Sequence, residues 1–287
     1  MKDEIFVLVV AILVMMAVLL SLPVVENFSS TEQLEDDELW DEFYADVYDQ
    51  LFMVPEKVKF EVGVIERDAL SKYPASKISI LDIGCGTGEY ASYLKHPYTG
   101  IDLSPDMIKH ARSKNPEAKF VVGDITNAQH YAPNTFSHIL CMTFTIYQFE
   151  NARRVLHNCY NWLTPGGMLV LHLVDPDQFD PVLEASSPFP AFSLQKYSKD
   201  RVTESEVDFD NFKYRAKFIK KSHSDDAVFE EYFTFKDKKI RQHRHNMVMP
   251  PKEKILEQAK TVGFIMEELV DMTPAQYEYQ YLAILKK

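Results

Sequence analysis

A buried strand that runs into a glycine-rich turn is the feature that most constrains this fold. Residues 78–83 (Ile-Ser-Ile-Leu-Asp-Ile) are typical of a buried strand, and Gly84, Gly86 and Gly88 follow. Glycine lacks a Cβ atom, so such a turn can adopt positive φ and let a ligand approach the backbone closely. A helix beyond the turn offers unpaired N–H groups. The pattern predicts a ligand site at the carboxyl ends of the strands of an open α/β sheet, with a plain tight turn as the alternative.

Strand-like and helix-like segments alternate along the middle of the chain. Further strands are expected at 98–102, 119–122, 136–142 and 168–174, with helices opening at Pro105 and near Asn151. This alternation predicts a parallel sheet covered on both faces. After residue 174 the strand-like segments 207–220, 228–235 and 240–248 succeed one another without helices, which predicts an antiparallel insert. A helix at 251–262 and strands at 264–271 and 279–285 complete the chain.

The N-terminal segment is apolar and uncharged from Ile5 to Val25. It has the length of about 20 residues that crosses a bilayer, so it predicts a transmembrane helix, with a cleaved signal peptide as the alternative. We therefore expect an anchor (1–25), an acidic linker (26–38) and one domain (39–287). Within that domain we expect a core at 75–175, a β insert at about 200–250, and a closing helix and strands at 251–287.

Location is inferred from charge and cysteine content. The scarcity of Lys and Arg just after the apolar segment would carry the domain across the membrane. Cys85, Cys141 and Cys159 show neither disulfide nor zinc spacing, which favours a reducing compartment. We expect a single-pass membrane protein with its domain on the cytoplasmic side, the lumenal or extracellular side being the alternative. The formal net charge of −12 disfavours nucleic acid as a partner.

The spacing of the glycines limits the class of ligand that the turn can bind. A dinucleotide-binding turn reads G-x-G-x-x-G, whereas here Gly84, Gly86 and Gly88 alternate with single residues and follow Asp82. A carboxylate at Asp82 repels a pyrophosphate but suits an ammonium group. A nicotinamide-dependent oxidoreductase is therefore disfavoured.

The segment Asp82-Ile83-Gly84-Cys85-Gly86-Thr87-Gly88 resembles the first motif of class I S-adenosylmethionine-dependent methyltransferases. The next three motifs of that family are resembled, in order, by residues 100–104, 123–125 and 163–169. The resemblance implies a Rossmann-like α/β fold with a seven-stranded, mainly parallel sheet. In this fold the antiparallel insert predicted above would follow strand five, and the transmembrane helix predicted from the apolar segment would stand in front of the domain.

The resemblance also implies S-adenosylmethionine as the cofactor. Asp82, Gly84 and Gly86 would line its methionine end with Cys85 beside them, Asp102 would hold the ribose with Leu103 nearby, and Asp124 would face the adenine. Ile125 would stack there or offer its backbone, and Tyr48 would close over the cofactor from the first helix. The full predicted cofactor set is Asp82, Gly84, Cys85, Gly86, Asp102, Leu103, Asp124, Ile125 and Tyr48.

Topology supplies the candidates on the acceptor side. His172, Tyr147 and Tyr44 are the candidate catalytic residues. A structural role is the alternative for His172, and a core position the alternative for Tyr44. Further candidates follow the strands or lie in the insert: Thr143, Gln148, Asp175, His243 and His245. The two insert histidines share one strand face and are expected to be solvated or to face the acceptor, and we expect no metal site.

The segment after strand five is loosely similar to small-molecule N-methyltransferases. This similarity implies methyl transfer to a small-molecule acceptor, an amine being favoured over a hydroxyl. Two alternatives stay open: a methyltransferase acting on a protein, glycan or lipid head group at the membrane, and a non-catalytic scaffold that binds S-adenosylmethionine.

Overall fold

The computed structural model describes residues 31–186, 195, 198, 200–221 and 223–287. Its largest element is a seven-stranded sheet with the strand order β11-β12-β6-β5-β2-β3-β4. The strands are β2 (Ile80–Ile83), β3 (Tyr98–Asp102), β4 (Lys119–Val122), β5 (Phe136–Cys141), β6 (Leu163–Val174), β11 (Ile265–Asp271) and β12 (Gln280–Lys286). The order reverses beside β2, so the turn after β2 lies at the switch point where α/β sheets bind ligands.

The sheet is mixed, and the prediction of a mainly parallel sheet is wrong. Pairing is parallel from β4 to β6, but β12 runs antiparallel to both β6 and β11. The cause is the connection between the last two strands. Residues 272–279 join β11 to β12 without a crossover helix, and parallel neighbours require such a crossover.

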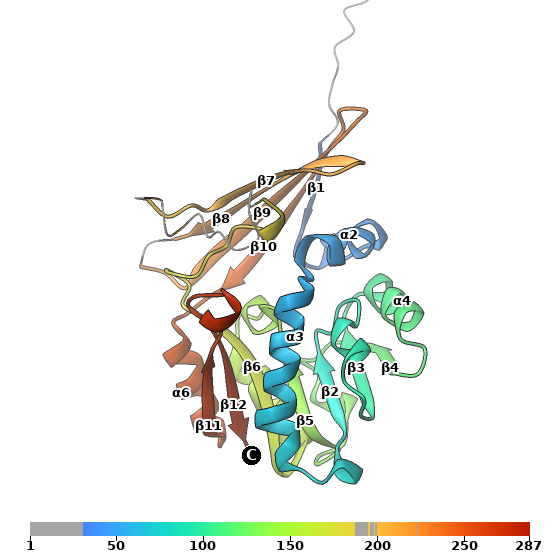
Figure 1. Ribbon diagram of the computed structural model, residues 1–287, viewed down its shortest axis with the longest axis vertical. Coiled ribbons are helices and arrows are strands. Elements are labelled where there is room, and N and C mark those ends of the chain that lie inside the picture. The colour runs from blue at the N-terminus through green and yellow to red at the C-terminus, as the bar shows by residue number, and fades with distance from the viewer. Residues whose placement is uncertain (1–30, 187–194, 196–197, 199, 222) are drawn as a thin grey trace, which may run out of the picture.

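Helices cover both faces of this sheet. They are α3 (Pro55–Val64), α4 (Pro105–Lys114), α5 (Ala152–Trp162) and α6 (Lys252–Val262), and Figure 1 shows α3 running across one face. Successive residues of β5 alternate between the two layers. Ile139 and Cys141 pack in the core beneath α5 and α6, whereas Leu140 packs in the core beneath α3. This period of two is what a strand buried on both faces produces.

A second sheet lies above the carboxyl ends of the first (Figure 1). Its strand order is β1-β10-β9-β8-β7, with β1 (Thr31–Glu35), β7 (Glu204–Asp208), β8 (Phe212–Lys220), β9 (Asp226–Phe235) and β10 (Ile240–Val248). Strands β7 to β10 are antiparallel, whereas β1 pairs in parallel with β10. Residues 31–35, which the sequence suggested were linker, therefore form an edge strand of this sheet.

Helix α2 (Glu42–Phe52) joins the two sheets. Asp41 caps it by accepting a hydrogen bond from the Tyr44 N–H at 3.1 Å. On its buried face Tyr44 and Val47 share a core cluster with Tyr214 and Phe233 of the second sheet. The insert thus holds the helix over the side of the first sheet that carries the glycine turn.

The predicted transmembrane helix and membrane location must be corrected. Ile5–Val25 lies outside the described residues. Within the described ranges no helix is long and apolar enough to cross a membrane. The longest α-helices there have 11 residues, about half of the roughly 20 that a spanning helix needs. Neither expectation is retained.

Candidate functional site

The turn after β2 is built from three glycines in the left-handed region. Gly84, Gly86 and Gly88 have φ values of 64°, 51° and 74°. At Gly84 space is as restrictive as conformation, because an added Cβ would lie 2.5 Å from the Thr145 side chain. At Gly86 an added Cβ would approach only Tyr48, at 3.8 Å. The backbone at Gly86 is therefore open toward α2, which leaves room for a ligand.

Asp102, at the end of β3, is tied to the same turn. Its Oδ2 accepts the Gly86 N–H at 2.9 Å and its Oδ1 accepts the Ser104 N–H at 3.0 Å. Burial raises the pKa of this carboxyl, and the hydrogen bonds from the backbone partly oppose that effect. Each oxygen keeps a lone pair for a donor in the adjoining cavity.

That cavity, the glycine-side cavity, has a volume of about 130 Å³. Seven of the nine predicted cofactor residues line it: Tyr48, Gly84, Gly86, Asp102, Leu103, Asp124 and Ile125. Asp124 also accepts both the N–H and the hydroxyl of Thr126, at 2.7 Å each. Asp82 and Cys85 do not line the cavity. Sequence reasoning missed Trp40, Met107 and Thr145, which do.

Asp82 lies behind the turn and not on its open side. Its carboxylate is buried and accepts the hydroxyl of Tyr98 on β3. Burial raises its pKa to about 7, although the Tyr98 hydrogen bond opposes the shift. Cys85 is also buried and packs in the core with Tyr98. Both residues therefore support the turn from within.

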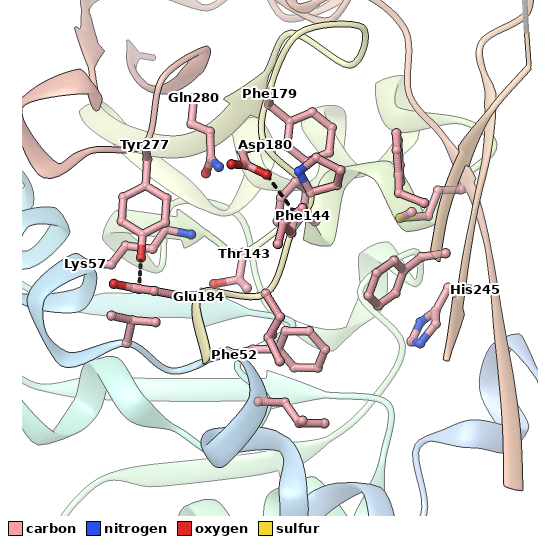
Figure 2. Close-up of a pocket in the computed structure, with 18 of the residues that line it drawn as sticks. Phe52, Lys57, Thr143, Phe144, Phe179, Asp180, Glu184, His245, Tyr277 and Gln280 are labelled. Atoms are coloured by element: carbon pink, nitrogen blue, oxygen red, sulfur yellow. Dashed lines mark hydrogen bonds between the residues drawn. The ribbon is translucent and has the colours of Figure 1, made fainter. Parts of the chain in front are cut away.

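A second cavity, the aromatic cavity, lies between the two sheets and has a volume of about 170 Å³. Its aromatic lining comes from α2 and the residues before it, from the insert, from the loops after β5 and β6, and from the connection between β11 and β12: Trp40, Tyr44, Tyr48, Phe52, Phe144, Phe179, Phe218, Phe229 and Tyr277. The charged side chains among its described lining residues are Lys57, Asp180 and Glu184. Figure 2 shows Lys57 beside Tyr277 and Glu184, with His245 on the far side.

The two cavities share four lining residues: Trp40, Tyr48, Thr143 and Gln148. Thr143 and Phe144, directly after β5, have φ values of 45° and 62°. Positive φ is costly for residues other than glycine, and such strain persists at functional sites where the surroundings enforce it. The strained residue Thr143 therefore stands where a molecule in one cavity would meet a molecule in the other.

His172 and Tyr147 are not at this junction. Both are fully buried and line neither cavity. The His172 Nδ1 accepts the Phe144 N–H at 3.4 Å, and its Nε2 lies 3.1 Å from the Gln280 Oε1. Burial lowers the pKa of His172 to about 3. The Tyr147 hydroxyl is bonded to the backbone of Val174. The structure thus gives both residues a structural place beneath the cavity floor.

Tyr44 does reach the aromatic cavity, and it brings a carboxylate that sequence reasoning missed. Its hydroxyl donates to Oε2 of the fully buried Glu231 at 2.6 Å. The same oxygen lies 2.6 Å from the Nε2 of His245, which also lines the cavity. Side chains of β9 alternate between its two faces, and this alternation was the one sequence feature that could have placed Glu231 on the inward face. Its partners are distant in sequence. Asp175, in contrast, lines neither cavity.

The sequence is similar to those of known methyltransferases. Residues 80–167 match a family model described as a methyltransferase domain. Over 173 residues the chain is 26% identical to malonyl-[acyl-carrier protein] O-methyltransferase 2 of Ilyobacter polytropus, covering 54% of this chain and 63% of that protein. Over 100 residues it is 33% identical to phosphoethanolamine N-methyltransferase 1 of Triticum aestivum, covering 32% of this chain and 20% of that protein. The chain therefore spans less than two thirds of the length of these relatives.

A solved structure is similar over most of the chain. The structure of the CcbJ methyltransferase from Streptomyces caelestis superposes with a TM-score of 0.64 at 15% identity, covering 86% of this chain and 96% of that chain. At this identity the likeness shows the fold alone. It extends beyond the residues that the family model matches.

Proposed function

The chain belongs to the class I S-adenosylmethionine-dependent methyltransferases, and we propose that it methylates a small molecule held in its aromatic cavity. S-adenosylmethionine supplies the methyl group, carried on a sulfonium that leaves as a neutral thioether. The observation that carries the proposal is the junction of the two cavities at Trp40, Tyr48, Thr143 and Gln148. A donor on one side and an acceptor on the other would meet there.

The glycine-side cavity suits the cofactor. The free lone pairs of Asp102 would accept the two ribose hydroxyls, because a carboxylate can take a hydrogen bond at each oxygen. The open backbone at Gly86 would admit the methionine portion beneath Tyr48. Asp124 and Ile125 would lie beside the adenine. Asp82 and Cys85 would act indirectly, by holding the turn.

The aromatic cavity favours a compact acceptor with an apolar body. Its volume of about 170 Å³ and its concave, mostly apolar lining are those of a small-molecule site. The relatives named above act on a carrier-linked malonyl group and on phosphoethanolamine, so they divide between oxygen and nitrogen acceptors.

An amine is favoured over a hydroxyl by the lining of the cavity. Asp180 and Glu184 provide two carboxylates against the single ammonium of Lys57. Aromatic faces also attract a cationic amine, by about 0.5–2 kcal/mol for each favourable contact. Positioning of the acceptor beside the donor supplies most of the catalysis, because the leaving group needs no activation.

The test uses the full chain with S-adenosylmethionine carrying a deuterated methyl group. 2-Phenylethylamine and 2-phenylethanol serve as acceptors of matched size and shape. We expect mass spectrometry to find the labelled methyl on the amine, with S-adenosylhomocysteine formed in equal amount. Methylation of the alcohol alone would overturn the preference for nitrogen. If the chain binds S-adenosylmethionine in calorimetry yet labels only protein or lipid head groups added in its place, the small-molecule proposal fails.

A further inference from the structure

Glu231, His243 and His245 form a buried cluster beside the aromatic cavity. Their ligand atoms lie within 4.8 Å of one another. All three side chains come from the neighbouring strands β9 and β10, and Tyr44 of α2 and Tyr214 of β8 complete the group. Such a cluster can hold a metal ion, or it can orient a histidine as a base.

The hydrogen bonds of His243 argue against a metal. The Arg241 Nε–H donates to the His243 Nε2 at 2.8 Å, so the proton of the neutral ring sits on Nδ1. That Nδ1 faces the Glu231 Oε2 at 3.6 Å and has no hydrogen-bond partner. A metal ligand normally donates its second ring N–H to an acceptor, whereas here a guanidinium donates to the ring. The neighbouring positive charge also repels a cation.

His245 differs from His243 in that its Nε2 donates a hydrogen bond and does not accept one. Glu231 is buried, which by itself raises its pKa, but its interactions with the neighbouring His243 and His245 rings outweigh burial and lower the pKa to about 2. It is therefore a carboxylate at neutral pH and must accept from the His245 Nε2. The Tyr44 and Tyr214 hydroxyls donate to the same carboxylate at 2.6 and 2.8 Å, which fixes its orientation. The proton of neutral His245 is thereby held on Nε2.

His245 then presents its other nitrogen as a base. None of the hydrogen bonds found among the described residues uses the His245 Nδ1, and the ring lines the aromatic cavity beside Trp40. Trp40 lines the glycine-side cavity as well, so this ring stands next to the junction. A carboxylate that orients an imidazole in this way holds the correct tautomer and stabilises the imidazolium that forms.

We propose that His245 is the general base of this methyltransferase, and that Glu231 and Tyr44 are positioning residues for it. The inference rests on the proposed function, because it assigns the proton that an amine acceptor must lose. The N–H bond of the acceptor's ammonium breaks, its electron pair stays on nitrogen, and the proton bonds to the His245 Nδ1. The freed pair then bonds the methyl carbon as the carbon–sulfur pair returns to sulfur. The imidazolium afterwards releases its proton to water.

The first test does not depend on any acceptor. Nitrogen–proton correlation spectra of the ¹⁵N-labelled full chain, assigned with His245→Asn, should show His245 as the Nε2–H tautomer. Glu231→Gln should shift that tautomer, because the amide no longer offers two accepting oxygens. Glu230→Gln, on the outward side of the same strand and paired with Arg244 at 2.5 Å, should leave it unchanged. An Nδ1–H tautomer in the native chain would overturn the proposal even if methyl transfer occurs.

The second test measures methylation of 2-phenylethylamine. His245→Asn should lower kcat by about 10²–10⁴-fold while leaving the affinity for S-adenosylmethionine unchanged in calorimetry. His245→Gly should regain activity when imidazole is added, a rescue that a purely structural role would not give. His157→Asn, an exposed control on α5, should behave as the native chain. An unchanged kcat in His245→Asn would reject His245 as the base. If no acceptor is methylated although the predicted tautomer is found, the proposed function fails while the Glu231–His245 pair stands.

Discussion

The Gly86 N–H donates to the Asp102 Oδ2 at 2.9 Å, so the glycine turn and the carboxylate at the end of β3 form one unit. Removing the carboxylate should both loosen the turn and delete the acceptors for the ribose. We expect Asp102→Ala to weaken S-adenosylmethionine binding by about 10- to 100-fold, since a hydrogen bond to a charged group contributes about 1.5–3 kcal/mol. Calorimetric titration measures the change. Asp208→Ala, an exposed control on β7, should bind normally; equal affinities in the two variants would remove Asp102 from the site.

A side chain at Gly84 should be incompatible with the turn. Its φ of 64° and the Thr145 side chain 2.5 Å from an added Cβ both oppose Gly84→Ala. We expect a loss of about 1–3 kcal/mol in the free energy of unfolding, from the backbone strain and the forced shift of Thr145. Gly63→Ala is the matched control, because it lies within α3 with nothing within 4 Å of an added Cβ. It should be neutral or stabilising by up to about 1 kcal/mol. Denaturant unfolding of both variants decides the point.

Local sequence rules reached much of the cofactor side. The glycine turn, Asp102 and the Ser104 cap of α4, whose hydroxyl accepts the Met107 N–H at 3.1 Å, each follow from residues close together in the chain. The strand–helix alternation likewise predicted the order of the elements from β2 to β6. Asp82 shows the limit of this reasoning, because its burial depends on Tyr98 and thus on how β3 packs beside β2.

The acceptor side depends on contacts that no local pattern contains. Tyr44 and Glu231 are 187 residues apart, and they meet only because α2 packs against the insert. The pairing of Glu231 with His243 further depends on the register between β9 and β10. His172 had a suggestive place at the end of a strand, yet the side chains packed around it decide that it is enclosed.

Arg241 should be the residue that fastens α2 to the second sheet. Its Nη2 donates to the Asp41 Oδ2 at 2.5 Å, and its guanidinium lies 4.8 Å from the centre of the Phe43 ring. We expect Arg241→Met to cost about 2 kcal/mol in unfolding free energy and to increase hydrogen exchange in α2, because a buried charged donor is lost. Arg244→Met, which breaks a more exposed pair with Glu230 on the same strand, should cost under about 1 kcal/mol. If exchange in α2 rises no more in Arg241→Met than in Arg244→Met, the helix is held by other contacts.

Two enclosed histidines should make the fold sensitive to acid. Burial lowers the pKa of His138 to about 4 and that of His172 to about 3, against an ordinary value of 6.5. Between the lowered pKa values and 6.5 the unfolded chain binds more protons than the folded chain. The stabilising contribution of the neutral rings is therefore fully present above about pH 6.5 and falls as the pH drops toward 4. Each histidine contributes a slope of at most about 1.4 kcal/mol per pH unit. Denaturant unfolding of His172→Gln between about pH 7.5 and pH 5 should show a shallower slope than the native chain, whereas the exposed His157→Gln should not. A native chain equally stable across this range would mean that both rings bind protons as readily in the folded state as in the unfolded state, which would contradict the prediction.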